Sequence, residues 1–334
     1  MAQEMKRLKR GTVCLDGAKL HANASRDSAL SHGHIEKLEV QLKAEVQERL
    51  ALAEQADRAD IPGGVSLPEG IKRREDRRAV MAAAKAKIAA RAAERYQREK
   101  AEYDEKSARR AAKEEETGKK ARGKTPEAPK PGSRDGDPIH LTDEESRIMP
   151  VAGGGFEQAY NAQAAVDAPT MRVVATGVTQ APNDKEQVEP MLKTIKGQTA
   201  VLGAVERLMA DTGFSSEKNI KACEAAHIEP LIAVARDAHP PGGRERYCEP
   251  DLLPADATPM QALAHSLKTK AGRALYALRK QTVEPVFGII KSVMGFRQFL
   301  LRGLNKVSGE WTRVCLAWNV KRRAVLRPNC AGSC

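Results

Sequence analysis

Aromatic side chains are scarce in this chain, since Trp, Tyr and Phe make up 4% of its 334 residues. That share is thin for a single globule with one packed core, so part of the chain should lie outside any compact core. The length still suffices for two or three domains. We therefore expect a folded domain combined with a segment that has little to bury.

Cysteine and long apolar runs are also lacking. The six Cys residues are scattered without a Cys-x-x-Cys spacing, which argues against a structural zinc site or a disulfide framework. No apolar run approaches the roughly 20 residues of a membrane span. No apolar stretch follows the basic amino terminus, as a secretory signal would require. These absences predict reduced thiols, a cytoplasmic location and no membrane partner.

Positive charge is what the chain has in excess. It holds 56 Lys and Arg residues against 44 Asp and Glu residues, a formal net charge of +12. Such an excess attracts polyanions, either nucleic acid or an anionic membrane surface. Without an apolar anchor, the composition favours nucleic acid.

Residues 31–116 are predicted to form a charged helical insertion. A first helix over 33–59 ends at a Pro-Gly-Gly breaker, and a second helix over about 69–116 is rich in Ala, Lys, Arg and Glu. Two solvated helices in succession favour a hairpin. The Pro, Gly and Lys residues that follow predict a flexible basic linker over 117–150.

Within that linker, residues 118–125 satisfy the phosphate-loop pattern G-x-x-x-x-G-K-[ST]. A working phosphate loop needs a strand before it and a helix after it, so that backbone N–H groups surround the phosphate. Here a charged helix precedes the motif and three Pro residues follow it. We interpret the match as chance, and no cofactor-binding residue is assigned.

A second set of elements begins near residue 156. Asn183 or Asp184 is expected to cap its first helix, and Pro230 predicts an edge position for its last strand. The expected strands of the whole chain are 12–15, 160–167, 171–179, 205–210 and 228–234, and the expected helices after the linker are 185–196, 217–226, 259–281, 284–304 and 307–323.

This order of elements predicts an α/β fold. With the insertion between strands one and two, it is the order of a ribonuclease-H-like mixed sheet flanked by helices. The expected domains are 1–30 for the first strand and its flank, 31–116 for the insertion, 117–150 for the linker, 151–325 for the rest of the sheet domain, and 326–334 for a disordered tail.

Two acids follow short apolar runs and precede glycines: Asp16 stands before Gly17, and Asp211 stands two residues before Gly213. Acids at the carboxyl ends of different strands can hold the divalent cations that phosphodiester chemistry uses. Asp-Gly is also common in turns that have no function. Asp167 fits the same strand-end description, so spacing alone leaves the choice open.

The stretch 276–291 is a third candidate feature. Glu284 and Lys291 are seven residues apart and share a helix face, while Lys280 lies four residues before Glu284. One acid between bases suits metal and phosphate contacts, although a solvated salt-bridge face has the same pattern. Pro285 favours a kink or a helix start at Glu284.

The stretch 296–323 interleaves bases with aromatic residues. We interpret its aromatic residues mainly as core, and its bases, among them Arg297 and Arg302, as candidate phosphate contacts.

Several short motifs follow one another along the chain. They are Asp16-Gly17-Ala18-Lys19, Ala22-Asn23-Ala24-Ser25, Asp143-x-x-Ser146-Arg147-Ile148-Met149, Tyr160-Asn161-Ala162-Gln163-x-x-Val166-Asp167, Ala210-Asp211-x-Gly213-Phe214-x-Ser216-Glu217-x-Asn219, Glu284-Pro285-Val286-Phe287-Gly288-x-Ile290-Lys291 and Phe299-x-x-Arg302-Gly303. Together and in this order they resemble the DDE transposases of bacterial insertion sequences, in the subgroup with a helical insertion after the first catalytic strand. The resemblance covers residues 11–323, nearly the whole chain.

The resemblance implies a ribonuclease-H-like catalytic domain in which Asp16, Asp211 and Glu284 bind two Mg²⁺ or Mn²⁺ ions, with Asp167 as the reserve candidate. It also implies DNA contacts. The Tyr…Arg…Glu…Lys signature of the family maps to Tyr276, Arg279, Glu284 and Lys291. Four residues separate Arg279 from Glu284 where relatives often have three, so Lys280 shares the role of phosphate contact with Arg279 as an open alternative.

The implied activity is metal-dependent DNA strand cleavage and strand transfer of an insertion sequence. The implied partners are double-stranded DNA, namely terminal repeats and target, and a second copy of the chain on that DNA, in the bacterial nucleoid. Relatives carry a helical region before the first catalytic strand, so a truncated copy that has lost its activity stays open beside the active transposase. The alternative is a non-catalytic DNA-binding or regulatory fragment.

Overall fold

The computed structural model describes residues 11–25, 29–59, 67–118, 123–151, 153–199, 203–234, 248–254 and 256–326. The first ten residues, part of the phosphate-loop-like motif and residues 327–334 of the expected tail lie outside the described residues. The chain divides into two compact units. One joins Met1–Arg26 to Glu145–Cys334, and the other is Asp27–Glu144.

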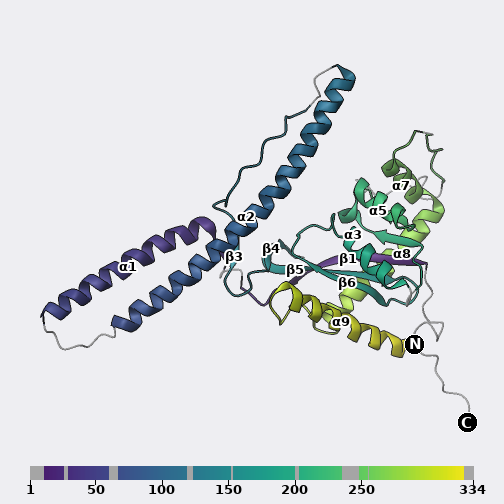
Figure 1. Cartoon of the computed structure of the whole chain (residues 1–334). Helices are drawn as coiled ribbons and strands as arrows, with labels where there is room; N and C mark the ends of the chain where they lie inside the picture. The colour runs from purple at the N-terminus through teal and green to yellow at the C-terminus, as the bar shows by residue number, and fades with distance from the viewer. Residues whose placement is uncertain are drawn as a thin grey trace, which may run out of the picture. The chain divides into compact units, whose positions relative to one another are not determined.

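A six-stranded mixed sheet forms the centre of the first unit (Figure 1). Its strands are β1 (Thr12–His21), β4 (Arg147–Pro150), β5 (Phe156–Asp167), β6 (Val173–Thr179), β7 (Arg207–Ala210) and β8 (Glu229–Ile232). The strand order is β4-β5-β1-β7-β8, and β6 also pairs with β5. Antiparallel pairing joins β1, β4, β5 and β6, while β7 is parallel to β1 and β8 to β7. The prediction of a ribonuclease-H-like mixed sheet flanked by helices is confirmed, and β8 with Pro230 is an edge strand as predicted.

Strand β1 is longer than the sequence indicated. The expected turn at Asp16-Gly17 is wrong, because β1 continues to His21 and pairs with β5 from Val13 to His21. Cys14, Ala18 and Leu20 are buried, so the alternation of a half-buried strand runs through the glycine. Strand β7 pairs only with Thr12–Cys14, so among the described residues the second half of β1 has no strand partner on that side until His21, which bonds to the backbone of Arg297 and Phe299.

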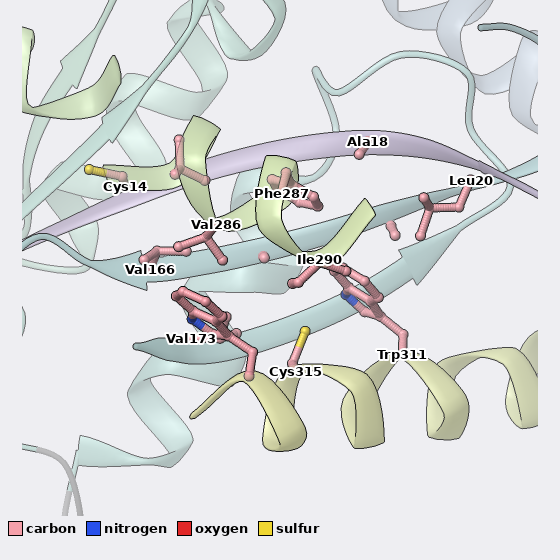
Figure 2. Packing of buried hydrophobic residues seen from close by; sticks show 14 of the residues in the cluster. Cys14, Ala18, Leu20, Val166, Val173, Val286, Phe287, Ile290, Trp311 and Cys315 are labelled. Carbon is pink, nitrogen blue, oxygen red and sulfur yellow. The ribbon is translucent and has the colours of Figure 1, made fainter. Parts of the chain in front are cut away.

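Helices cover both faces of the sheet. On one face lie α8 (Lys270–Ser292) and α9 (Leu304–Val325), whose apolar residues, among them Phe287 and Trp311, pack on the strands (Figure 2). Phe299 belongs to the same cluster. Trp311 and Trp318 are buried there, which confirms these aromatic residues as core. On the other face lie α3 (Val188–Gly197), α5 (Glu217–Ala225) and α7 (Pro259–Lys268), and a one-turn helix η2 (Thr212–Phe214) follows β7.

The predicted break between residues 281 and 284 is wrong. The helix breaks earlier, at Thr269, whose hydroxyl oxygen accepts a hydrogen bond from the N–H of Gly272 and caps α8. Helix α8 then runs through Pro285, although proline removes one helical hydrogen bond. Buried residues on both sides of the proline, such as Val283 and Val286, hold the helix against the sheet. Glu284 therefore lies inside a continuous helix.

The second unit is a helical hairpin. Helix α1 (His32–Ala59) and helix α2 (Leu67–Thr117) lie side by side (Figure 1) and share a small core of Ile35, Met81, Ala84 and Ile88. Ion pairs such as that of Lys85 with Glu39 (3.0 Å) reinforce the contact.

The predicted flexible linker holds more structure than expected. It contains β3 (Pro138–His140), which pairs with β2 (Ala29–Ser31), and β4 of the main sheet. Asp137 forms an ion pair with Arg95 of α2, and Arg134 forms one with Glu99 at 2.9 Å. Because α2 extends past α1, its exposed face can hold this returning chain, which composition alone could not indicate.

In the described part of the chain, none of the helices has the length and apolar character that crossing a membrane requires.

Candidate active site

Asp16 lies at the centre of the candidate site. The alternation of β1 puts it on the same face as Cys14 and Ala18, the face that α8 and α9 cover. Burial raises the pKa of its carboxyl to about 6, and the negative charges of Asp211 and Asp184 act in the same direction. The Arg279 guanidinium and the N–H of Gly17 oppose that shift.

Asp211 comes to the same place from β7. Since β7 runs parallel to β1, its carboxyl end points toward the unpaired half of β1. One carboxylate oxygen of Asp211 accepts a hydrogen bond from the N–H of Gly213 (2.8 Å), which fixes the turn into η2. Two acids separated by 195 positions in the sequence thus lie near each other where β7 ends beside β1.

Helix α8 supplies the third acid and a cation. The Arg279 guanidinium places Nη1 3.2 Å from Oδ2 of Asp16 and Nη2 3.4 Å from Oε1 of Glu284. The Arg279 side chain is only 11% exposed. Tyr276 donates a hydrogen bond from its hydroxyl to the carbonyl of Ala210 (3.3 Å), which ties α8 to the end of β7 beside Asp211. The guanidinium therefore joins the carboxylates of a strand and a helix.

Lys280 takes no part in these contacts. Its side chain is exposed, while Arg279 one residue earlier faces the acids. Of the two candidate bases that the spacing left open, the structure brings only Arg279 to Asp16 and Glu284.

An open groove lies beside Asp16, lined in part by Lys19, Glu284 and Lys291. The ammonium group of Lys291 is 6.0 Å from the ring centre of Phe287. Burial lowers the pKa of Lys291, and the charges of Lys19 and Arg297 add to that decrease, so several cations lie close together here. Arg297 donates to the carbonyl of Lys291 (3.2 Å).

Arg302 lies away from these lining residues, on the loop before α9. Its Nε donates to the carbonyl of Asn23 at 3.0 Å, and its side chain is exposed.

A comparison with protein families shows the family to which the chain belongs. The pattern of the transposase DDE domain matches residues 124–320. The chain belongs to this transposase family. A comparison with curated proteins gives no match. The matched region contains Asp211, Glu284 and Lys291, whereas Asp16 precedes it, and the pairing of β1 with β5 and β7 brings that acid to the others.

Asp167, the reserve candidate for a DDE acid, lies elsewhere. Asp16 is opposite Ala164 in the β1–β5 register and Asp167 is opposite Val13, which places the two acids about 10 Å apart along the strands. Asp167 is 1% exposed and accepts hydrogen bonds from the N–H (3.2 Å) and hydroxyl of Thr170. These contacts close the turn into β6.

DDE transposases use divalent metal ions, and the carboxylates here fit such an ion in chemistry. Among the described residues, no three His, Cys, Asp or Glu side chains are arranged closely enough to share one ion. Burial raises the pKa of Asp16, so added positive charge would favour its ionised form, and a hard cation that prefers oxygen ligands would supply such charge. Arg279 supplies part of this charge through its contacts with Asp16 and Glu284.

Two residues of this region were missed by sequence reasoning. Lys19 follows Gly17 by two positions on β1, and continued alternation of the strand was the signal that could have placed it. Asp184 was expected to cap the next helix, but Gln187 occupies that position without a side-chain cap. Asp184 instead accepts a hydrogen bond from Lys19 at 3.2 Å.

Proposed function

We propose that this chain catalyses metal-dependent DNA strand cleavage and strand transfer as the transposase of an insertion sequence. The observation that carries the proposal is that Arg279 contacts both Asp16 and Glu284, while Asp211 lies close enough for its charge to raise the pKa of Asp16. Membership of the transposase DDE family supports the same reaction class.

Each residue of the site has a role in this proposal. Asp16, Asp211 and Glu284 would hold two Mg²⁺ or Mn²⁺ ions. When bound, such ions activate the attacking hydroxyl and stabilise the leaving 3′ oxygen of the phosphodiester. Lys291 and Arg297 would attract and hold the DNA phosphates beside the acids, since both carry positive charge at the groove.

Arg279 would neutralise the carboxylates until metal arrives and would then contact the scissile phosphate. A guanidinium suits both tasks, because its planar nitrogens match carboxylate and phosphate oxygens equally well. Transposition joins two element ends, so we propose that a homodimer assembles on terminal-repeat and target DNA in the nucleoid. Arg302, which is exposed on the adjoining loop, would extend the phosphate contacts.

The test uses duplex DNA from the ends of the element that encodes the chain. We expect nicking in Mg²⁺ that stops in chelator and falls by at least roughly 1,000-fold in Asp211→Asn, the range for loss of an essential catalytic group. Cleavage that survives Asp211→Asn unchanged contradicts the proposal. DNA binding in chelator without any cleavage in Mg²⁺ or Mn²⁺ identifies a non-catalytic DNA-binding fragment instead.

A further inference from the structure

Asp184 lies in the loop between β6 and α3, and three side chains bind its carboxylate. Oδ1 accepts hydrogen bonds from Nε2 of Gln163 (2.6 Å) and from Nδ2 of Asn161 (2.7 Å). Oδ2 accepts one from the ammonium group of Lys19 (3.2 Å). The Asp184 side chain is 15% exposed. A nearly buried acid is thus held by the two central strands β5 and β1.

The same loop is fastened at two further points. Nδ2 of Asn161 also donates to the carbonyl of Ala181 (3.1 Å). The buried Asn219 of α5 donates to the carbonyl of Lys185 (2.7 Å) and to that of Phe214 (2.6 Å). Phe214 ends the turn that begins at Asp211. The loop of Asp184 is therefore attached both to β5 and to the turn that carries the second acid.

Gly17 makes room for Asp184 beside the acids, and Gly213 lies close to it. A Cβ atom on Gly17 would lie 2.6 Å from Oδ1 of Asp184 and 2.3 Å from Nε2 of Gln163, distances that no real side chain tolerates. A Cβ atom on Gly213 would lie 3.6 Å from Oδ2 of Asp184. The carboxylate of Asp184 thus sits against the backbone just after Asp16 and just after Asp211.

This arrangement costs stability. Asn161 and Gln163 are 0% and 1% exposed, and their side-chain oxygens have no hydrogen-bond partner among the described residues. Both amides direct their NH₂ groups to Asp184 and leave buried acceptors unsatisfied, which is unfavourable for folding. Buried groups left in this state call for an explanation other than stability, and a functional site is a common one.

We propose that Asp184 is a positioning residue of the DDE site, which fixes the segments after Asp16 and Asp211 at the spacing that metal binding needs. The inference rests on the proposed function. Metal ligands must be held within about half an ångström of their working geometry, and residues behind the ligands commonly change metal affinity 10- to 100-fold. Asp184 does not touch the reacting atoms, since it acts through the two backbone segments and through Lys19.

Three variants separate the contacts of Asp184. Asp184→Ala removes all of them, whereas Asp184→Asn keeps an oxygen for Asn161 and Gln163 but turns an NH₂ group toward Lys19. Lys19→Met removes only the ion pair. Glu189→Gln is the matched control, because Glu189 is a 67% exposed acid on the neighbouring helix α3 and pairs with Lys218.

The measurement is Mn²⁺ binding by titration calorimetry on the full chain without DNA, accompanied by urea unfolding. We expect Asp184→Ala to raise the Kd for Mn²⁺ by 10- to 100-fold and Asp184→Asn to raise it by less. Glu189→Gln should leave the Kd unchanged. Cleavage by Asp184→Ala should need correspondingly more Mn²⁺ while kcat at saturation recovers. If Asp184→Ala does not fold, the Kd of Asp184→Asn for Mn²⁺ decides whether Asp184 has the positioning role.

The outcomes distinguish this inference from the function on which it rests. Wild-type affinity in a folded Asp184 variant overturns the positioning role alone, provided that Asp211→Asn abolishes binding. Mn²⁺ affinity that survives Asp211→Asn, or a wild-type chain that binds no Mn²⁺, overturns the proposed function and this inference together.

Discussion

Arg279 on helix α8 and Asp16 on strand β1 form an ion pair at 3.2 Å across 263 residues of sequence. The pair joins helix α8, which lies inside the matched family region, to the one proposed DDE acid that precedes this region. The guanidinium supplies part of the positive charge that a buried carboxylate needs.

The bridging position of Arg279 predicts that it cannot be replaced by its neighbour. Arg279→Gln should lower the cleavage rate by roughly 100- to 1,000-fold, the range for loss of one donor to developing charge. Arg279→Lys should recover little, because one ammonium group cannot reach both Asp16 and Glu284 as two guanidinium nitrogens do. Lys280→Gln is the matched control, with an expected change within about twofold. Equal losses at both positions would show that the two bases share the role.

The pKa of Asp16 predicts a pH-dependent stability. It rises from 3.8 in the unfolded chain to about 6 in the folded chain, chiefly through burial. Between these values the folded chain binds more protons than the unfolded chain. The free energy of unfolding therefore falls as pH rises through this window, by about 3 kcal/mol in all.

Asp16→Asn removes this titration. In chelator, the variant should gain stability over the wild type as the pH goes from 4 to 7, and urea unfolding at the two pH values measures the gain. A difference between variant and wild type that is equal at both pH values would contradict the raised pKa.

The two candidate first acids predict opposite effects. Asp167 closes a buried turn with Thr170, so Asp167→Ala should destabilise the chain by about 1–3 kcal/mol. Its affinity for Mn²⁺ should remain that of the wild type. Asp16→Ala should abolish Mn²⁺ binding without that loss of stability. Calorimetry and urea unfolding on both variants check this. Loss of Mn²⁺ binding in Asp167→Ala but not in Asp16→Ala would make Asp167 the first acid of the DDE site.

The position of Lys291 in the groove predicts a phosphate contact. Lys291→Gln should weaken DNA binding for all sequences and reduce the slope of log K against log salt by about 0.9, the value for one lost phosphate contact on duplex DNA. Lys193→Gln removes one exposed charge from α3, on the opposite face of the sheet, and should leave the slope unchanged. Equal slopes for Lys291→Gln and the wild type would exclude the contact.

Local chemistry in the sequence was enough for most of the elements. The strand patterns of β5 and β6 and the apolar spacing of α3 and α5 predicted those segments, although β5 is buried on both faces from Gln158 to Asp167. Local rules failed where packing overrode them. A strand continued through Asp16-Gly17 because β5 pairs along all of it, and a helix continued through Pro285 because buried residues hold both of its sides.

The sequence by itself determined the order of the elements, the excess of positive charge and the residue types that the DDE site requires. It left open whether Asp16 or Asp167 joins Asp211 and Glu284 as the first acid. It also left open whether Arg279 or Lys280 faces these acids. Only the tertiary structure separated the members of each pair in space, because sheet register and helix rotation depend on contacts between segments hundreds of residues apart. The same long-range contacts place Lys19 and Asp184 behind the acids, where no local pattern pointed.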